Sequence, residues 1–176
     1  MTTDSPFFDS PEGDSDDALS HLLGLGNELV SGVAGAAAGL SIAGPPGAFA
    51  GAVGGPVLKR VLDAVAGEIA RWRLGPRELQ RTGAVFRLTL GEIQRELDSG
   101  RGVRQDNFFS LGSAGVGRTS ADEVLEALLL AAQRDPEERK IPYYARLMKN
   151  VAFSEAIGVY DAHNLMRLLK DLNYRQ

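Results

Sequence analysis

The residues of this chain that come nearest to a chemical motif lie between Gly112 and Thr119. They read G-S-A-G-V-G-R-T, which has the spacing of the phosphate-binding loop G-x-x-x-x-G-K-[ST] with Arg118 in place of the lysine. Such a loop offers backbone N–H groups to phosphate oxygens at the start of a helix. The lysine is missing, and the sequence after the loop has no apolar strand that ends in an aspartate. We therefore expect a flexible linker that leads into a capped helix, and no bound nucleotide.

A second group with chemical potential is formed by the acids and bases of residues 137–144, E-E-R-K-I-P-Y-Y. Their spacing of three and four places them on one helical face, so the expected structure is a set of solvated ion pairs. His163 lies between apolar positions with no nucleophile near it, which is typical of a core or surface histidine. Tyr143, Tyr144 and Phe153 are predicted to be core aromatics. We expect no catalytic residue and no enzymatic activity.

The composition removes several classes of site. The chain has 176 residues, no cysteine and two histidines, His21 and His163. Disulfides and thiolate chemistry are therefore absent, and a histidine-rich metal site is excluded. We expect no metal ion and no cofactor.

Charge is distributed unevenly along the chain. Residues 1–28 carry seven acids and no lysine or arginine, and the net charge is −4, so the remainder carries −4 − (−7) = +3. A mildly positive body with an acidic end argues against nucleic-acid binding. The N-terminus lacks the basic region of a secretory signal. We expect a cytoplasmic protein, with a membrane surface as the alternative location.

The first residues are predicted to be a disordered acidic tail. Residues 1–15 are polar, acidic and interrupted by two prolines, so they cannot bury enough apolar surface to order themselves. Phe7 and Phe8 stand out in this tail. They are either a chance exposed pair or a short motif that docks into a partner's groove.

An uncharged Gly/Ala-rich stretch of thirty residues, 29–58, follows. Pro45 and Pro46 divide it into two arms, and we expect a helical hairpin. Its glycines form two rows of a glycine zipper, in which every fourth residue lies on one helical face; these are Gly47, Gly51 and Gly55, and Gly35 and Gly39. Such rows let two helix backbones approach closely. Three readings remain: tight packing within the protein or an oligomer, insertion into a membrane as a hairpin, and a flexible hinge. Each arm has about 12–16 residues, fewer than the roughly 20 that cross a bilayer.

The remaining pattern is helical. It predicts one domain, residues 16–176, made of an all-α bundle of about five helices with the Gly/Ala-rich helical hairpin packed on or beside it, and the first range given below runs into that hairpin. Helices are expected over 18–40, 57–74, 76–98, 120–134, 136–152 and 160–173, with a Gly-rich linker over 99–118 and a C-terminal subregion over 119–176. Pro142 should kink or restart the fifth of these helices. Ser120 and Glu123 have the form of a capping box at the start of the fourth. The last helix has an apolar face of four leucines, Leu165, Leu168, Leu169 and Leu172.

Part of the C-terminal region resembles other proteins. The run KIPYYARLMKNVAF, an Asn-Leu-x-x-Leu helix and the final Leu-x-Tyr-Arg-Gln look like a widespread group of uncharacterised bacterial helical proteins. The resemblance covers about residues 118–176. It implies no activity and no site residues, because none is established for that group.

These observations favour a non-enzymatic function. The leading hypothesis is a helix-mediated assembly protein whose Gly/Ala-rich stretch makes close helix contacts, in an oligomer or at a membrane surface. Its sharpest form is a membrane-inserting bacterial effector of the defence type. The alternative is a soluble helical adaptor that binds a protein partner through residues 118–176. Self-association or a protein partner is expected in either case.

Overall fold

The computed structural model describes residue 24, residues 74–110 and residues 119–172. Several predictions fall outside these ranges: the acidic tail with Phe7 and Phe8, the helices over 18–40 and 57–74, the Gly/Ala-rich stretch and most of the phosphate-loop sequence. The glycine rows also lie outside the described residues; they are Gly35, Gly39, Gly47, Gly51 and Gly55.

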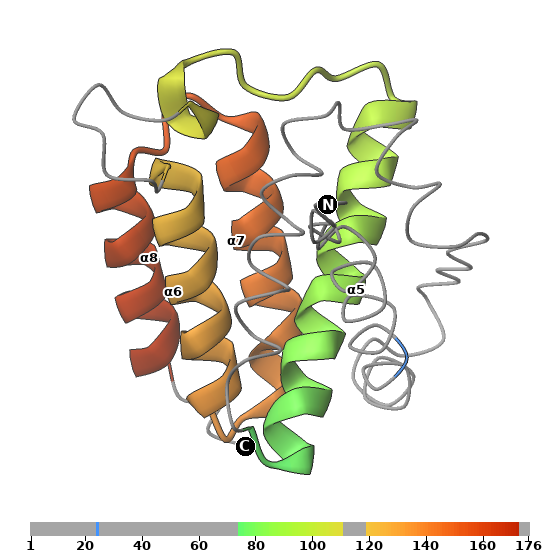
Figure 1. The fold of residues 1–176 in the computed structure, drawn as a ribbon, viewed down its shortest axis with the longest axis vertical. Helices are drawn as coiled ribbons and strands as arrows, with labels where there is room; N and C mark the ends of the chain where they lie inside the picture. Colours follow the sequence, from blue (N-terminus) through green and yellow to red (C-terminus); the bar gives the residue numbers. More distant parts are fainter. Residues whose placement is uncertain (1–23, 25–73, 111–118, 173–176) are drawn as a thin grey trace, which may run out of the picture.

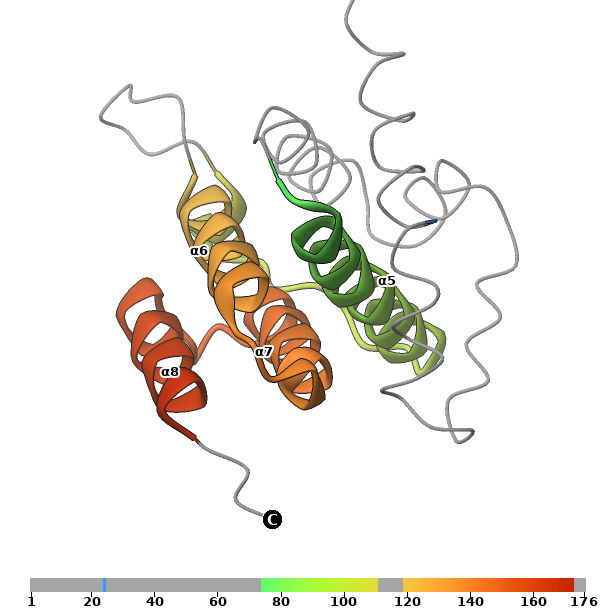
Figure 2. The same ribbon diagram turned by 90° about the horizontal axis from the view of Figure 1, so that it is seen from below.

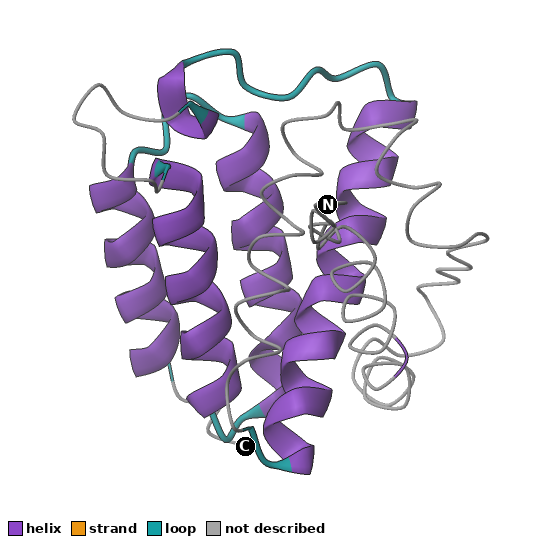
Figure 3. Ribbon diagram, in the orientation of Figure 1, coloured by secondary structure: helices purple, strands orange, loops and turns teal. Residues whose placement is uncertain are grey.

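The described residues form an all-α bundle, as predicted (Figures 1 and 3). Its four α-helices are α5 (Pro76–Asp98), α6 (Ser120–Arg134), α7 (Ile141–Phe153) and α8 (Val159–Asp171). Two short 3-10 helices, η1 (Asn107–Phe109) and η2 (Glu138–Lys140), precede α6 and α7. No β-strand occurs within these ranges.

The ends of α5 follow from local chemistry. Pro76 stands at its first turn, where a missing N–H costs nothing, and Glu78 accepts a hydrogen bond from the Gly75 N–H at 2.7 Å. At the other end Gly100 has φ +84° and donates its N–H to the Leu97 carbonyl at 2.8 Å. A left-handed glycine just past the last turn is a common helix stop.

The cap of α6 lies one residue earlier than predicted. The Thr119 hydroxyl accepts a hydrogen bond from the Asp122 N–H at 3.0 Å, and the Asp122 carboxylate accepts one from the Thr119 N–H at 2.8 Å. The reciprocal pair is therefore Thr119 with Asp122, and the prediction of Ser120 with Glu123 was wrong. Threonine is also a good cap, so the sequence offered two overlapping boxes.

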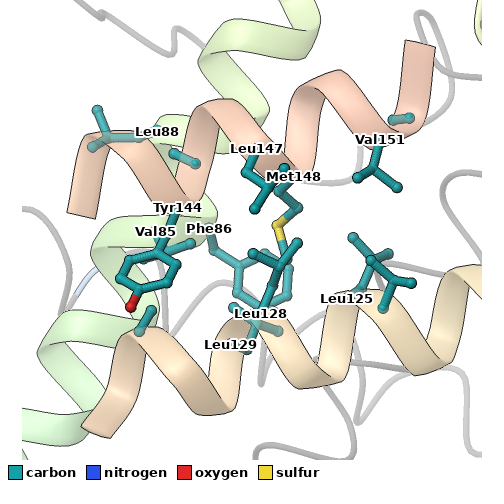
Figure 4. Packing of buried hydrophobic residues seen from close by; sticks show 14 of the residues in the cluster. Val85, Phe86, Leu88, Leu125, Leu128, Leu129, Tyr144, Leu147, Met148 and Val151 are labelled. Atoms are coloured by element: carbon teal, nitrogen blue, oxygen red, sulfur yellow. The ribbon is translucent and has the colours of Figure 1, made fainter. Parts of the chain in front are cut away.

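The core lies between α5, α6 and α7. Apolar side chains from these three helices interdigitate in Figure 4, and large, fully buried side chains among them include Phe86, Leu128, Tyr144 and Met148. α8 packs against α6 and α7 on the side away from α5 (Figure 2). The described helices thus run from α5 at one edge to α8 at the other.

Pro142 restarts the chain as a new helix. η2 ends at Lys140, and α7 begins at Ile141 with Pro142 in its first turn. This outcome is one of the two that the sequence predicted.

The connection after α5 differs from the prediction. Residues 99–110 were expected to be part of a Gly-rich linker, yet Arg104 and Phe108 are buried and η1 packs on α6. The backbone N–H of Arg104 also donates to the Ala152 carbonyl at 3.1 Å. This part of the connection therefore belongs to the core.

The prediction that Tyr143 is a core aromatic was wrong. Tyr143 is 42% exposed, although Tyr144 and Phe153 are buried as expected. On α8 only Leu169 of the four leucines is buried, together with Ala162 and Met166. The other three leucines face solvent.

Candidate functional site

One cluster of buried charged residues is centred on Lys140, which is 2% exposed. Its ammonium nitrogen lies 3.2 Å from the Asp135 carboxylate and 3.7 Å from Glu137, and it donates a hydrogen bond to the Lys170 carbonyl at 3.0 Å. The Tyr144 hydroxyl donates a hydrogen bond at 2.9 Å to Oδ2 of Asp135, the same oxygen that pairs with Lys140. The prediction that these charges form solvated pairs on one helix was wrong for Lys140.

Lysine, aspartate and tyrosine are residue types that occur in acid–base sites. Here, however, they are arranged as a structural cluster that joins the ends of three helices. Asp135 ends α6, Lys140 precedes α7, and the Lys170 carbonyl belongs to the last turn of α8. Burial and the hydrogen bond to Asp135 raise the pKa of Tyr144 above its usual range, so its hydroxyl stays protonated. The cluster holds three helix ends together.

Arg104 forms a second buried polar cluster at the other end of the bundle. Its guanidinium donates to Asp106 at 2.7 Å, to the Val151 carbonyl at 3.1 Å and to the Ile157 carbonyl at 2.9 Å. It also lies over the Phe108 ring, 4.0 Å from the centroid. These hydrogen bonds from Arg104 hold the pKa of the Asp106 carboxyl below its usual range. The guanidinium therefore ties the connection after α5 to the end of α7 and to the loop that follows it.

A small apolar cavity lies beside this cluster, lined by side chains that include Thr89, Ile93, Phe108 and Met148. Its volume is about 10 Å³. A cavity of that size is at the lower limit for one water molecule, and an apolar lining gives a water no partners. It is a packing defect of the core.

The sequence-predicted chemical residues are only partly described. Of the phosphate-loop sequence only Thr119 lies within the described ranges, and its hydroxyl is the helix cap of α6. His163 is half-exposed, with its Nε2 3.9 Å from a Glu123 carboxylate oxygen. Within residues 74–110 and 119–172 no group of three His, Asp or Glu side chains is placed to hold a metal ion.

An exposed leucine row on α8 is the feature that sequence reasoning missed. The leucine row consists of Leu165, Leu168 and Leu172, whose exposed fractions are 40%, 61% and 57%. The three residues lie about a quarter turn around the helix from the inward face of Ala162, Met166 and Leu169. The periodicity was visible in the sequence, but the sequence did not show that this side of α8 stays exposed.

Acidic residues of α8 lie closer to the leucine row than the basic residues do. At about 100° per residue, Asp161 and Asp171 lie within about 100° of its centre, whereas Arg167 and Lys170 lie more than about 130° away. All four are exposed. The side of α8 that carries the row is therefore apolar with acidic neighbours.

Among the helices of the described ranges, none combines the length and the apolar character that crossing a membrane requires. Comparisons with protein-family models, with curated proteins and with solved structures find no match to the chain. The likeness of residues 118–176 to bacterial helical proteins therefore stays a hypothesis.

Proposed function

We propose that this protein is a non-enzymatic helical adaptor that binds a protein partner through the leucine row of α8. The observation that supports the proposal is the exposure of Leu165, Leu168 and Leu172 on an edge helix. Single exposed leucines are ordinary, but three on one helical ridge form a continuous apolar strip.

The spacing of the row indicates what it binds. Its members are three and four residues apart, which is the spacing of the a and d positions of a coiled-coil seam. A partner helix that lies lengthwise along α8 meets all three side chains, as in helix-in-groove recognition. Burying a half-exposed leucine contributes about 1 kcal/mol, so the row supplies a few kcal/mol of apolar contact.

The border charges narrow the partner further. Asp161 lies in line with the leucine row one turn before Leu165, Asp171 lies about 90° to one side of it, and the basic residues of α8 lie on the far side of the helix. A partner helix with lysine or arginine beside its apolar strip is electrostatically complementary to this arrangement. The partner that fits the leucine row is therefore an amphipathic helix with a basic border.

A synthetic probe tests this assignment directly. The probe is a labelled helix of about three heptads with leucines at positions a and d and lysines beside them, and the comparison peptide has glutamates in place of the lysines. We expect the lysine peptide to bind more tightly in fluorescence anisotropy. Leu168→Ala should weaken binding by about fivefold, which corresponds to about 1 kcal/mol. Arg167→Ala, on the far side of α8, is the matched control and should leave binding unchanged.

Two results would contradict the adaptor function as stated. Equal affinity, or no affinity, for both peptides would show that the row is not a basic-helix site. If light scattering finds a dimer of the wild type that Leu168→Ala converts to a monomer, the occupant is a second copy of the chain.

We also infer a second function from the Gly/Ala-rich stretch, residues 29–58, which lies outside the described residues. The observation that supports this second function is the four-residue spacing of Gly47, Gly51 and Gly55 within thirty uncharged residues. The corresponding proposal is self-assembly through close helix contacts, in solution or at a membrane surface, with a membrane-inserting bacterial effector as its sharpest form. Flotation with liposomes and a dye-leakage assay separate this function from the adaptor, which needs no lipid.

A further inference from the structure

Helix α5 is buried on two opposite sides. Thr89 and Ile93 face the core and line its small cavity. Ala84 and Gly91 lie about 140–180° around the helix from these two residues, yet Ala84 has no exposed surface and Gly91 is buried. A helix at the edge of a bundle normally exposes such positions to solvent.

The described helices account for only one of these sides. The Thr89 hydroxyl contacts the Met148 sulfur at 3.3 Å, and Glu96 pairs with Lys149 at 2.6 Å, so α7 lies along the inner side of α5. α6 lies on that side too, and Figure 2 shows none of the described elements on the opposite side. On the outer face of α5 (Ala84, Arg87 and Gly91), Ala84 and Gly91 are thus buried although none of the described elements covers them.

We propose that the outer face of α5 is a docking surface and that its occupant is residues 57–73 of the same chain. Only Leu74 and Gly75 separate this segment from Pro76, the first residue of α5. Two helices joined by so short a connection pack as antiparallel neighbours. This surface is distinct from the leucine row, and the proposal does not depend on the adaptor function.

The segment has the pattern that the outer face requires. Its apolar residues Val61, Val65 and Ile69 recur every four residues and share one side of a helix. The outer face offers the small residues Ala84 and Gly91, with the half-buried Arg87 between them. Glycine inside a helix costs about 1 kcal/mol relative to alanine, and a close helix contact offsets that cost.

The antiparallel arrangement sets a register. Residues whose numbers add up to about 150 lie at the same height, because the turn is centred on Gly75 and both helices rise by the same amount per residue. Val65 then lies opposite Ala84, and Val61 lies opposite Arg87. The carboxylate of Asp63, two residues from Val65, belongs to the far side of the segment.

Cysteine pairs in the full-length chain test this register, since the protein has no cysteine of its own. The first pair is Val65→Cys with Ala84→Cys, and the second is Val61→Cys with Arg87→Cys. The second pair replaces a half-buried side chain, so it remains informative if the buried Ala84→Cys fails to fold. The control pair is Asp63→Cys with Ala84→Cys. Each folded variant is oxidised mildly and examined by mass spectrometry and by size exclusion under non-reducing conditions.

We expect both test pairs to form an intramolecular disulfide in the monomer, because facing Cβ atoms about 4 Å apart suit that bond. The control pair should stay reduced. Disulfides between two molecules would overturn the proposal, because the occupant would then be a second copy of the chain. A folded protein in which neither test pair oxidises, or in which the control pair oxidises as readily, would overturn it as well.

Discussion

At the scale of single residues, the two buried cations donate hydrogen bonds to carbonyl groups in the last turns of helices. Lys140 donates to the Lys170 carbonyl in the last turn of α8, and Arg104 donates to the Val151 carbonyl in the last turn of α7. The final carbonyls of a helix lack partners within the helix and carry partial negative charge. A buried cation placed there gains hydrogen bonds as well as its carboxylate partner, which offsets the cost of its own desolvation.

Lys140→Met should cost about 3–5 kcal/mol of the free energy of unfolding. Methionine fills a similar volume but leaves the Asp135 carboxylate, which is 6% exposed, without its cation. Urea unfolding measures the loss. Adding Asp135→Asn removes the orphaned charge and should recover part of the loss, so a double variant less stable than Lys140→Met would contradict the buried-pair account.

Lowering the pH should reduce the contribution of Asp106 to the stability of the folded protein. Its folded-state pKa is lowered by the hydrogen bonds from Arg104. A lowered pKa gives stability that is complete above the unfolded-state pKa of about 3.9 and is lost as the pH falls through the lower folded-state value. We expect wild type to melt at a higher temperature than Asp106→Asn at pH 7, and the difference to shrink below about pH 4. Melting curves between pH 7 and pH 2 test this. A constant difference would show that ionisation of Asp106 contributes nothing.

At the scale of elements, the sequence predicted helices well wherever end signals bracket an apolar period. The predicted helices 76–98 and 120–134 coincide with α5 and α6. Pro76 and Gly100 mark the ends of the first, and a Thr/Ser-rich start followed by Pro136 brackets the second. The bounds of α8, Val159–Asp171, differ from the predicted 160–173 by one residue at the start and two at the end.

Burial was predicted less well, because periodicity reports which residues share a side and not which sides acquire a neighbour. The leucine row has the same period as the buried Leu169, but α6 and α7 cover only part of α8. On α5 the opposite holds. Ala84 and Gly91 share one side of the helix with polar residues, and both are nevertheless buried. Arg104 was missed since a lone arginine in a Gly-rich connection gives no signal of the carbonyls that surround it.

The candidate site was therefore only partly predictable. The C-terminal region was named from sequence as a possible partner-binding surface, but its exposed residues became visible only once α8 was placed at the edge of the bundle (Figure 1). The phosphate-loop sequence shows the opposite case, in which a motif is visible but its one described residue, Thr119, serves as a helix cap.

At the scale of the whole molecule, the two proposed contact surfaces belong to the two edge helices of the described bundle. α5 and α8 form its two edges in Figure 2, with α6 and α7 between them. A partner on the leucine row therefore leaves the outer face of α5 untouched. Residues 57–73, if docked on that face, also connect the described bundle to the Gly/Ala-rich stretch that ends at residue 58.

Gly51→Leu tests whether that stretch makes a close contact, because its two effects have opposite signs. Leucine has the better helix propensity, by about 0.5–1 kcal/mol, so an exposed helix or a linker should be unaffected or stabilised. If the glycine row is a packing surface, the larger side chain should cost about 1–3 kcal/mol through overpacking. Unfolding curves and light scattering at several protein concentrations, with and without liposomes, measure both effects.

The conditions under which the loss appears identify the contact. A loss in solution at every concentration places the contact within one molecule, and a loss that grows as the protein self-associates places it between copies. A loss seen only with liposomes assigns it to a membrane-bound form. Phe49→Leu, which changes a neighbouring side chain without adding bulk to the row, is the matched control. If Gly51→Leu proves neutral under all these conditions, the glycine row is not a contact surface, and self-assembly through residues 29–58 loses its main support.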